Sequence, residues 1–220
     1  MKILIPAALA GMFLLQACNS DNKSTTDTKT MSDTTMKMPE HNDAKMDGDK
    51  MDSNNEMMKS MMSSMDKMKA VKMNGDFDAE FASMMIEHHQ GAIDMANIEL
   101  KSGKDQSMKT LAQNIITEQT AEITKFKTLL AAHKENITKG DHPELMEAMN
   151  GMDAKMKEVT MTANTDKDFA MMMKVHHLGA IDMAKGELGD GKNYELKKLA
   201  QQIIETQNKE IVQFDQFLSK

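Results

Sequence analysis

Two stretches of the chain bring methionine and histidine together at helical spacing. They are MMIEHHQGAIDMA, residues 84–96, and MMMKVHHLGAIDMA, residues 171–184. In each, methionines precede a histidine pair by about one helical turn, so thioether and imidazole groups lie on the same side of a helix. These groups are ligands for soft cations, above all Cu(I). The sequence therefore predicts metal binding for Cu(I), with Ag(I) and Cu(II) as alternative ions, and leaves open whether the two stretches form one shared site or two.

The two stretches belong to an internal repeat. A shift of 88 residues lays residues 56–130 on residues 144–218 without a gap, and fourteen of the twenty positions in 81–100 match their partners in 169–188. Such self-similarity indicates a duplicated structural unit. Met171 has no methionine partner, because Ser83 stands opposite it. The candidate metal ligands are the residues present in both copies: Met84, Met85, His88, His89, Met95, Met172, Met173, His176, His177 and Met183.

Each unit is predicted to contain three helices. Apolar residues recur at steps of three and four over residues 56–73, 77–101 and 105–132, and the second copy repeats the pattern. No segment has the character of a strand. We therefore expect an all-α protein in which two helical hairpins form a four-helix bundle, with the methionine-rich first helix of each unit along or beside it. The repeats, residues 56–132 and 144–220, are expected to pack as one domain.

Polar side chains interrupt the apolar seam of the helix that follows each histidine pair. Burying them is costly unless they have hydrogen-bond partners. The histidine pairs are the expected partners, and a glutamate that accepts a hydrogen bond from a ligand imidazole would fix its tautomer. Gly91 and Gly179 lie in mid-helix, where they would let the facing backbone come close. The residues expected to support the ligands are Gln119, Glu122, Gln207 and Glu210.

Other interpretations stay open on the residues alone. Histidines on a bundle seam are often core residues bonded to Gln or Glu. A redox enzyme holding iron or manganese is a second alternative, although di-iron bundles use Glu-x-x-His pairs and methionines stand three residues before His88 and His176. A third is an envelope-stress lipoprotein without metal, in which methionine fills the core and absorbs oxidants. No catalytic set of residues emerges, so we predict no enzyme activity.

The N-terminal residues predict a membrane anchor. Residues 1–17 resemble a bacterial lipoprotein signal, with one lysine, a short apolar stretch and a small residue before Cys18, the only cysteine. A lipid on Cys18 would hold the protein on the periplasmic side of a bacterial membrane, inner or outer. Residues 18–55 are polar and poor in aliphatic side chains, which predicts a disordered tether. The tether contains five methionines and His41, for which we expect a role in metal capture.

The composition limits the partners. The 220 residues include 27 methionines and no arginine, and the net charge is −7. This charge argues against nucleic acid, whose phosphates require basic side chains. An acidic, thioether-rich protein suits a cation instead. We expect it to sequester the ion or to pass it to a copper efflux or storage protein, and the sequence leaves the oligomeric state open.

Longer motifs around the histidine pairs resemble a known family. HHQGAIDMA with LAQNIITEQTAEITKF downstream, and HHLGAIDMA with LAQQIIETQNKEIVQF, are similar to the domain-of-unknown-function 305 family in two tandem copies, over about residues 76–130 and 166–218. The resemblance implies a ferritin-like helical bundle built from such hairpins. Some relatives, of the CopM type, are periplasmic copper-binding proteins that bind copper or silver and support metal resistance. The resemblance therefore implies the same candidate ligands and a role in metal resistance.

Overall fold

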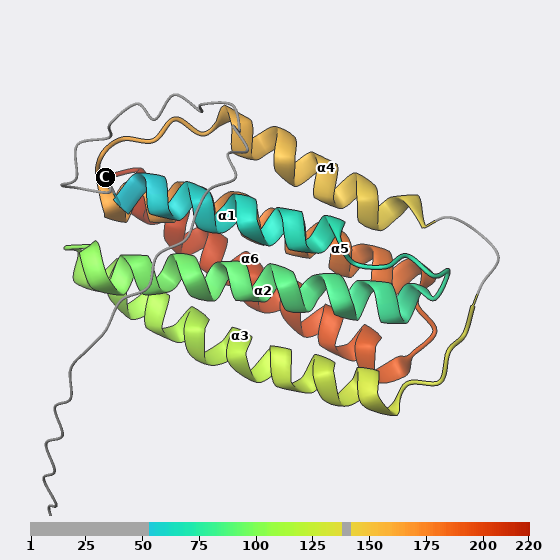
Figure 1. Ribbon diagram of the computed structural model, residues 1–220. Helices are drawn as coiled ribbons and strands as arrows, with labels where there is room; N and C mark the ends of the chain where they lie inside the picture. The colour runs from blue at the N-terminus through green and yellow to red at the C-terminus, as the bar shows by residue number, and fades with distance from the viewer. Residues whose placement is uncertain (1–52, 138–141) are drawn as a thin grey trace, which may run out of the picture. The chain divides into compact units, whose positions relative to one another are not determined.

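The computed structural model describes residues 53–137 and 142–220, which form six helices and no strand (Figure 1). The protein is all-α, as predicted. Within these residues, no helix combines the length and the apolar character needed to cross a lipid bilayer. The helices are α1 (Ser53–Lys69), α2 (Phe77–Ser102), α3 (Gln106–Ala132), α4 (Pro143–Glu158), α5 (Thr165–Asp190) and α6 (Tyr194–Leu218).

The internal repeat is visible in the helix boundaries. Helix α5 begins and ends 88 residues after α2, and α6 begins 88 residues after α3. The starts are capped alike, because the side chains of Asp76 and Asn164 both accept a hydrogen bond from the third residue after them. In the turn before the cap, Gly75 has φ 85° and its counterpart Ala163 has φ 62°. The duplicated sequence thus adopts the same backbone twice, even where the second copy lacks the glycine.

The helices form three layers, and the pair α2 and α5 is the middle layer. Helices α2 and α5 pack against each other, α3 packs on α2, and α6 packs on α5. On the other side, α1 contacts both α2 and α5, and α4 contacts α5 (Figure 1). The central position of α2 shows in its burial, since fourteen of its 26 residues are buried but only seven of the 27 in α3. The methionine-rich helices therefore complete the burial of the α2–α5 pair, as a layer of their own.

Helix α1 ends earlier than the sequence pattern predicts. The apolar spacing continues to Met73, but the helix stops at Lys69. The backbone N–H groups of Asn74 and Gly75 both donate to Oε1 of Glu80, at 2.6 Å, and so hold the connection against the first turn of α2. The need to reverse direction into α2 overrides the periodicity of residues 70–73.

Methionine and phenylalanine fill the core. The methionine stripe of α1 points inward at four positions, while Met62 on the same helix is 51% exposed. Four phenylalanines are fully buried and pair edge to face, Phe81 with Phe126 and Phe169 with Phe214, at centroid distances of 5.7 Å. Unbranched methionines fill the irregular space that remains between the layers.

The two mid-helix glycines make room for α1 and α4 rather than for α3 and α6. A Cβ on Gly91 would lie 2.5 Å from Cβ of Ser64 on α1, and one on Gly179 would lie 2.6 Å from Sδ of Met152 on α4. The prediction that these glycines admit the facing helix of the same hairpin is therefore wrong. The close approach is to α1 and α4, because those helices cover the opposite side of the central pair.

Candidate metal centre

The two copies of the histidine motif meet where α2 and α5 pack together. The rings of His88 and His176 are stacked with centroids 3.5 Å apart and an angle of 36° between their planes. Nε2 of His88 lies 3.0 Å from the backbone carbonyl oxygen of His176. Because these residues are equivalent in the repeat, the contact places the same position of both copies at one point. The repeats therefore converge on one location.

Contacts at both ends of the central pair are reciprocal. The carboxyl of Glu99 on α2 lies beside Asp166 on α5, and that of Glu187 on α5 lies beside Asp78 on α2. A residue of the first copy thus contacts a residue of the second, and the equivalent residues make the same contact in the opposite sense. This reciprocity is the mark of a twofold relation. The contact between His88 and His176 joins equivalent residues of the two repeats, so it lies at the local twofold axis.

The axial histidines are neutral and have free lone pairs. Both are fully buried. Burial, reinforced by the neighbouring imidazoles, holds the pKa of His88 and of His176 well below 6.5. Nδ1 of His88 and both ring nitrogens of His176 have no hydrogen-bond donor or acceptor among the described residues. Unpaired polar atoms in a buried core are unfavourable. A neutral imidazole has one nitrogen with a lone pair, so each of the two rings can offer one lone pair to a ligand.

The second histidine of each motif faces a glutamate of the neighbouring helix. Nε2 of His89 lies 2.8 Å from Oε2 of Glu122, and Nε2 of His177 lies 2.7 Å from Oε2 of Glu210. The groups are close but lack the alignment of a hydrogen bond. Each ring also packs against a phenylalanine, His89 on Phe126 and His177 on Phe214. Glu122 and Glu210 therefore lie beside the second, outer histidine of each pair, without the hydrogen bond that the sequence predicts.

The predicted methionine ligands are all in the core. They lie on the same two helices as the histidines, and each is at most 1% exposed: Met84, Met85, Met95, Met172, Met173 and Met183. Helical geometry puts Met84 and Met85 one turn before His88 and His89, and the second copy repeats the arrangement. All six methionines and all four histidines are therefore buried on the central helices α2 and α5.

Two predicted supporting residues do not behave as expected. Gln119 and Gln207 are buried, yet neither their amide nitrogens nor their oxygens find a hydrogen-bond partner in the described part of the chain. The prediction that they bond the histidine pairs is therefore not met in this structure, because Glu122 and Glu210 occupy the place beside the outer histidines. The predicted signal peptide, Cys18 and the tether up to residue 52 lie outside the described residues.

The paired carboxyls at the ends of α2 and α5 were not anticipated from the sequence. Glu99 and Glu187 are fully buried, and Asp78 and Asp166 each accept two backbone N–H groups from the turn after the partner helix. The available signal was identity of both acidic residues across the 88-residue shift. Acidic residues near helix ends are usually exposed, so that identity alone did not predict burial.

Comparison with known proteins gives the family. The family model for "Domain of unknown function (DUF305)" matches residues 15–130 and again residues 78–218. The chain belongs to the DUF305 family. The second match includes both histidine motifs and the helices between them. No curated protein matches the chain significantly.

Solved structures of CopM and of two DUF305 proteins are similar to this one. CopM in its Cu(II)-bound form is 32% identical, with a TM-score of 0.50, over 64% of this chain and 96% of that one. CopM in a silver-bound form obtained by soaking is 32% identical, with a TM-score of 0.51, over 64% and 94%. A candidate secreted DUF305 protein from Streptomyces coelicolor is 26% identical, with a TM-score of 0.55, over 67% and 94%. A DUF305 fragment from Deinococcus radiodurans, 23% identical with a TM-score of 0.52, over 65% and 95%, shares the fold.

Proposed function

We propose that this DUF305 protein binds Cu(I), and Ag(I) in its place, at a methionine–histidine centre between α2 and α5. The observation that carries the proposal is the stacked pair of His88 and His176, buried, neutral and with unpaired ring nitrogens. Neutral imidazole can donate a lone pair to a metal ion without first losing a proton. The pair lies on the two helices that carry the six buried methionines.

The donor set favours a soft ion. Thioether and imidazole groups select Cu(I), whereas carboxylates suit harder ions. At the axial pair the residues three positions earlier are Met85 and Met173, both fully buried, where a di-iron bundle would carry glutamates. The glutamates beside His89 and His177 are suited to orient those rings. The related CopM structures with Cu(II) and with silver support copper-group ions as the ligand.

The proposal also covers the location of the protein and the fate of the bound ion. We place the protein outside the cytoplasm, anchored by a lipid on Cys18, and without enzyme activity; the signal-like residues 1–17 and the secreted relative support this location. The ion would be sequestered or handed to a copper efflux or storage protein. In an oxidising compartment thiols form disulfides, so methionine and histidine are durable soft ligands there.

Competitive Cu(I) titration tests the function. The purified protein is titrated against a chromophoric Cu(I) chelator, next to a variant with His88, His89, His176 and His177 changed to glutamine. In this variant we expect at least one Cu(I) equivalent to bind at least a hundredfold more weakly than in the parent, so that it is lost as a tight step. Met62→Leu serves as the control, because this exposed methionine lies away from the core and its loss should leave the tight step unchanged.

Two results would contradict the proposal. One is a histidine variant that stays folded, by circular dichroism, and still binds Cu(I) with the original stoichiometry and affinity. The other is protein purified from its native compartment that contains iron or manganese with full occupancy, since harder metals in the centre would favour the redox-enzyme alternative.

A further inference from the structure

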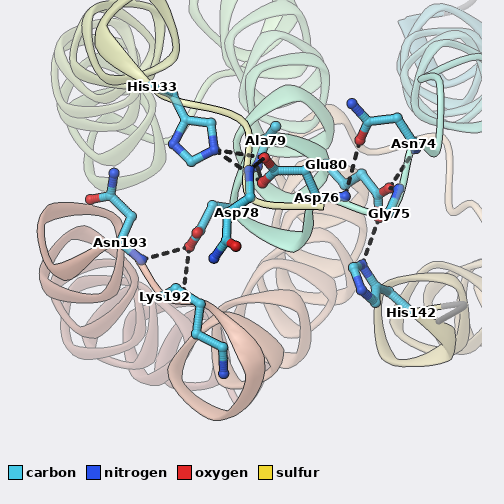
Figure 2. A network of polar contacts seen from close by, with 11 residues as sticks. Asn74, Gly75, Asp76, Asp78, Ala79, Glu80, His133, His142, Lys192 and Asn193 are labelled. Atoms are coloured by element: carbon cyan, nitrogen blue, oxygen red, sulfur yellow. Dashed lines mark hydrogen bonds and ion pairs between the residues drawn. The ribbon is translucent and has the colours of Figure 1, made fainter. Parts of the chain in front are cut away.

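A second cluster of potential ligands lies at the end of the bundle where α2 begins. Asp76, Asp78 and His133 present oxygen and nitrogen atoms that all lie within 4.8 Å of one another. Figure 2 shows their side chains between the start of α2, the end of α3 and the turn from α5 to α6. The cluster contains no sulfur ligand, so its chemistry differs from that of the central histidines.

Backbone N–H groups hold the two aspartates in place, and Asp76 holds His133. Asp76 caps α2 and accepts N–H bonds from Ala79, at 3.1 Å, and Asn136, at 2.6 Å. Nε2 of His133, just after α3, lies 2.9 and 3.0 Å from the two Asp76 oxygens. Oδ1 of Asp78 accepts the N–H groups of Lys192 and Asn193, each at 2.9 Å (Figure 2). Three separate elements thus position the donors before any ion binds.

A fully buried carboxyl lies next to the cluster, outside the three residues whose atoms lie within 4.8 Å of one another. Glu187 is completely inaccessible, and neither of its oxygens has a hydrogen-bond donor among the described residues. It lies under the turn that holds Asp78, because a Cβ on Gly191 would collide with its Oε1. Its neighbour is the Asp78 carboxyl, within hydrogen-bonding reach. Two neighbouring carboxyl groups in a dry site cannot both be ionised unless a cation lies between them. Without a cation, one of the two keeps its proton.

The opposite end of the bundle provides an internal comparison. There, Glu99 is buried beside Asp166, and Gly103 covers its carboxyl as Gly191 covers that of Glu187. However, Asn164 stands in the place of Asp76, and within the described residues no group of three histidine or acidic ligands forms there. A shared proton suffices for the Glu99–Asp166 pair, which has no third carboxylate or imidazole in such a group in the part of the chain that the structure describes. The additional carboxylate and imidazole at one end call for a different explanation.

We propose that Asp76, Asp78 and His133 form a binding site for a divalent cation, with Zn²⁺ as the representative ion, and that Glu187 joins them beside Asp78. Carboxylate and imidazole ligands suit ions of borderline hardness. Zn²⁺ binds such ligands at about 2.0–2.2 Å, so ligand atoms around one ion lie within about 4.2 Å of each other. For Asp76, Asp78 and His133, whose ligand atoms lie within 4.8 Å of one another, this requires an inward movement of about half an ångström, and Glu187 would have to move in beside Asp78. A bound ion would link the start of α2 to the ends of α3 and α5.

Calorimetric titration of the full chain with Zn²⁺ tests the site, with a matched pair of variants. We expect Glu187→Gln to weaken one Zn²⁺ equivalent at least tenfold, and Glu99→Gln, in the corresponding environment at the other end, to leave it unchanged. Asp76→Asn, which introduces the residue of the second repeat and keeps a helix cap, should also weaken binding at least tenfold. Circular dichroism and the unfolding midpoint without metal show whether each variant is folded.

The outcome is separate from that of the proposed soft-metal centre. The Zn²⁺ equivalent should persist in a variant whose four central histidines are glutamine, and Co²⁺ should give a visible absorption band there without a sulfur charge-transfer band. The site is refuted if no such equivalent binds, or if Glu187→Gln and Glu99→Gln change it equally. In that case a shared proton accounts for Glu187 and Asp78, whatever the result of the Cu(I) titration.

Discussion

The imidazoles of His88 and His176 stack at 3.5 Å although 88 residues separate them. The two motifs, for which the sequence leaves open one site or two, therefore meet at one point. If one ion binds there, the two histidines act as a unit, and mutations of such residues are not additive. We expect His88→Gln and His176→Gln each to weaken the tightest Cu(I) step at least tenfold, and the double variant to weaken it little further.

Competitive titration of the single and double variants measures this coupling. Two independent sites would instead give additive losses, with each single variant removing one of two equivalents. Met62→Leu in each background controls for non-specific thioether binding at the surface.

The metal-free protein should lose stability in mild acid. The pKa values of His88 and His176 are held well below 6.5, first by burial and then by neighbouring imidazoles. Below pH 6.5 the unfolded chain takes up protons at these residues and the folded protein does not, so their contribution, present above pH 6.5, is lost as the pH falls. The maximum slope is about 1.4 kcal/mol per pH unit for each histidine.

Urea unfolding between pH 7.5 and 5 measures that slope. The variant with glutamine at both positions should show a flatter dependence than the parent, whatever its absolute stability. An equal slope in the two proteins would contradict the assignment of neutral, buried histidines.

The buried glutamates should make the stability of the protein depend on pH with the opposite sign. Burial, together with Asp166 or Asp78, raises the pKa of Glu99 to about 8 and that of Glu187 to about 9. Their folded-state pKa values lie above the usual 4.5, so the stability they contribute is complete below pH 4.5 and is lost as the pH rises towards 8 and 9. Glutamine stays neutral, so Glu99→Gln and Glu187→Gln should gain stability relative to the parent between pH 5 and 9.

This measurement uses a chelator, so that divalent ions do not offset the charges. A stability difference between parent and variant that stays constant across the pH range would show that the carboxyls are ionised in the folded protein.

Ala163→Gly should stabilise the protein. Ala163 has φ 62°, in the left-handed region, where its counterpart in the first repeat is Gly75. That conformation costs an alanine roughly 1–2 kcal/mol, and glycine loses part of the gain through greater freedom in the unfolded chain. We expect a net gain of about 0.5–1 kcal/mol in the free energy of unfolding, measured with urea. Gly75→Ala is the reciprocal control and should destabilise, so the idea fails if both changes act in the same direction.

Gly91→Ala should be more harmful than Gly179→Ala. The added methyl on Gly91 would lie 2.5 Å from Cβ of Ser64, an atom fixed to the backbone of α1. On Gly179 it would meet first the sulfur of Met152, a flexible side chain. Overpacking typically costs about 1–3 kcal/mol, and we expect the upper part of that range for Gly91 and the lower part for Gly179. Equal unfolding midpoints would show that α1 moves as easily as a methionine side chain.

Periodicity and duplication predicted the helices. The 88-residue shift identified His88 and His176 as equivalent, and the structure places them together. The position of the layer formed by α1 and α4 was harder to predict from the sequence. A methionine stripe shows that a helix is buried, but not which helices it packs against. The Glu–Asp pairs were missed because each joins residues at least 67 positions apart, through turns whose N–H groups hold the aspartates.

The reciprocal contacts between α2 and α5 have an evolutionary consequence. An unduplicated three-helix unit could form the stacked histidines and the two Glu–Asp pairs only as a homodimer, in which every change would appear twice. Fusion into one chain lets each half change alone. Asp76 against Asn164, and Ser64 against Met152, are differences of this kind. One centre can thus stay symmetric while the two ends of the same molecule take on separate tasks.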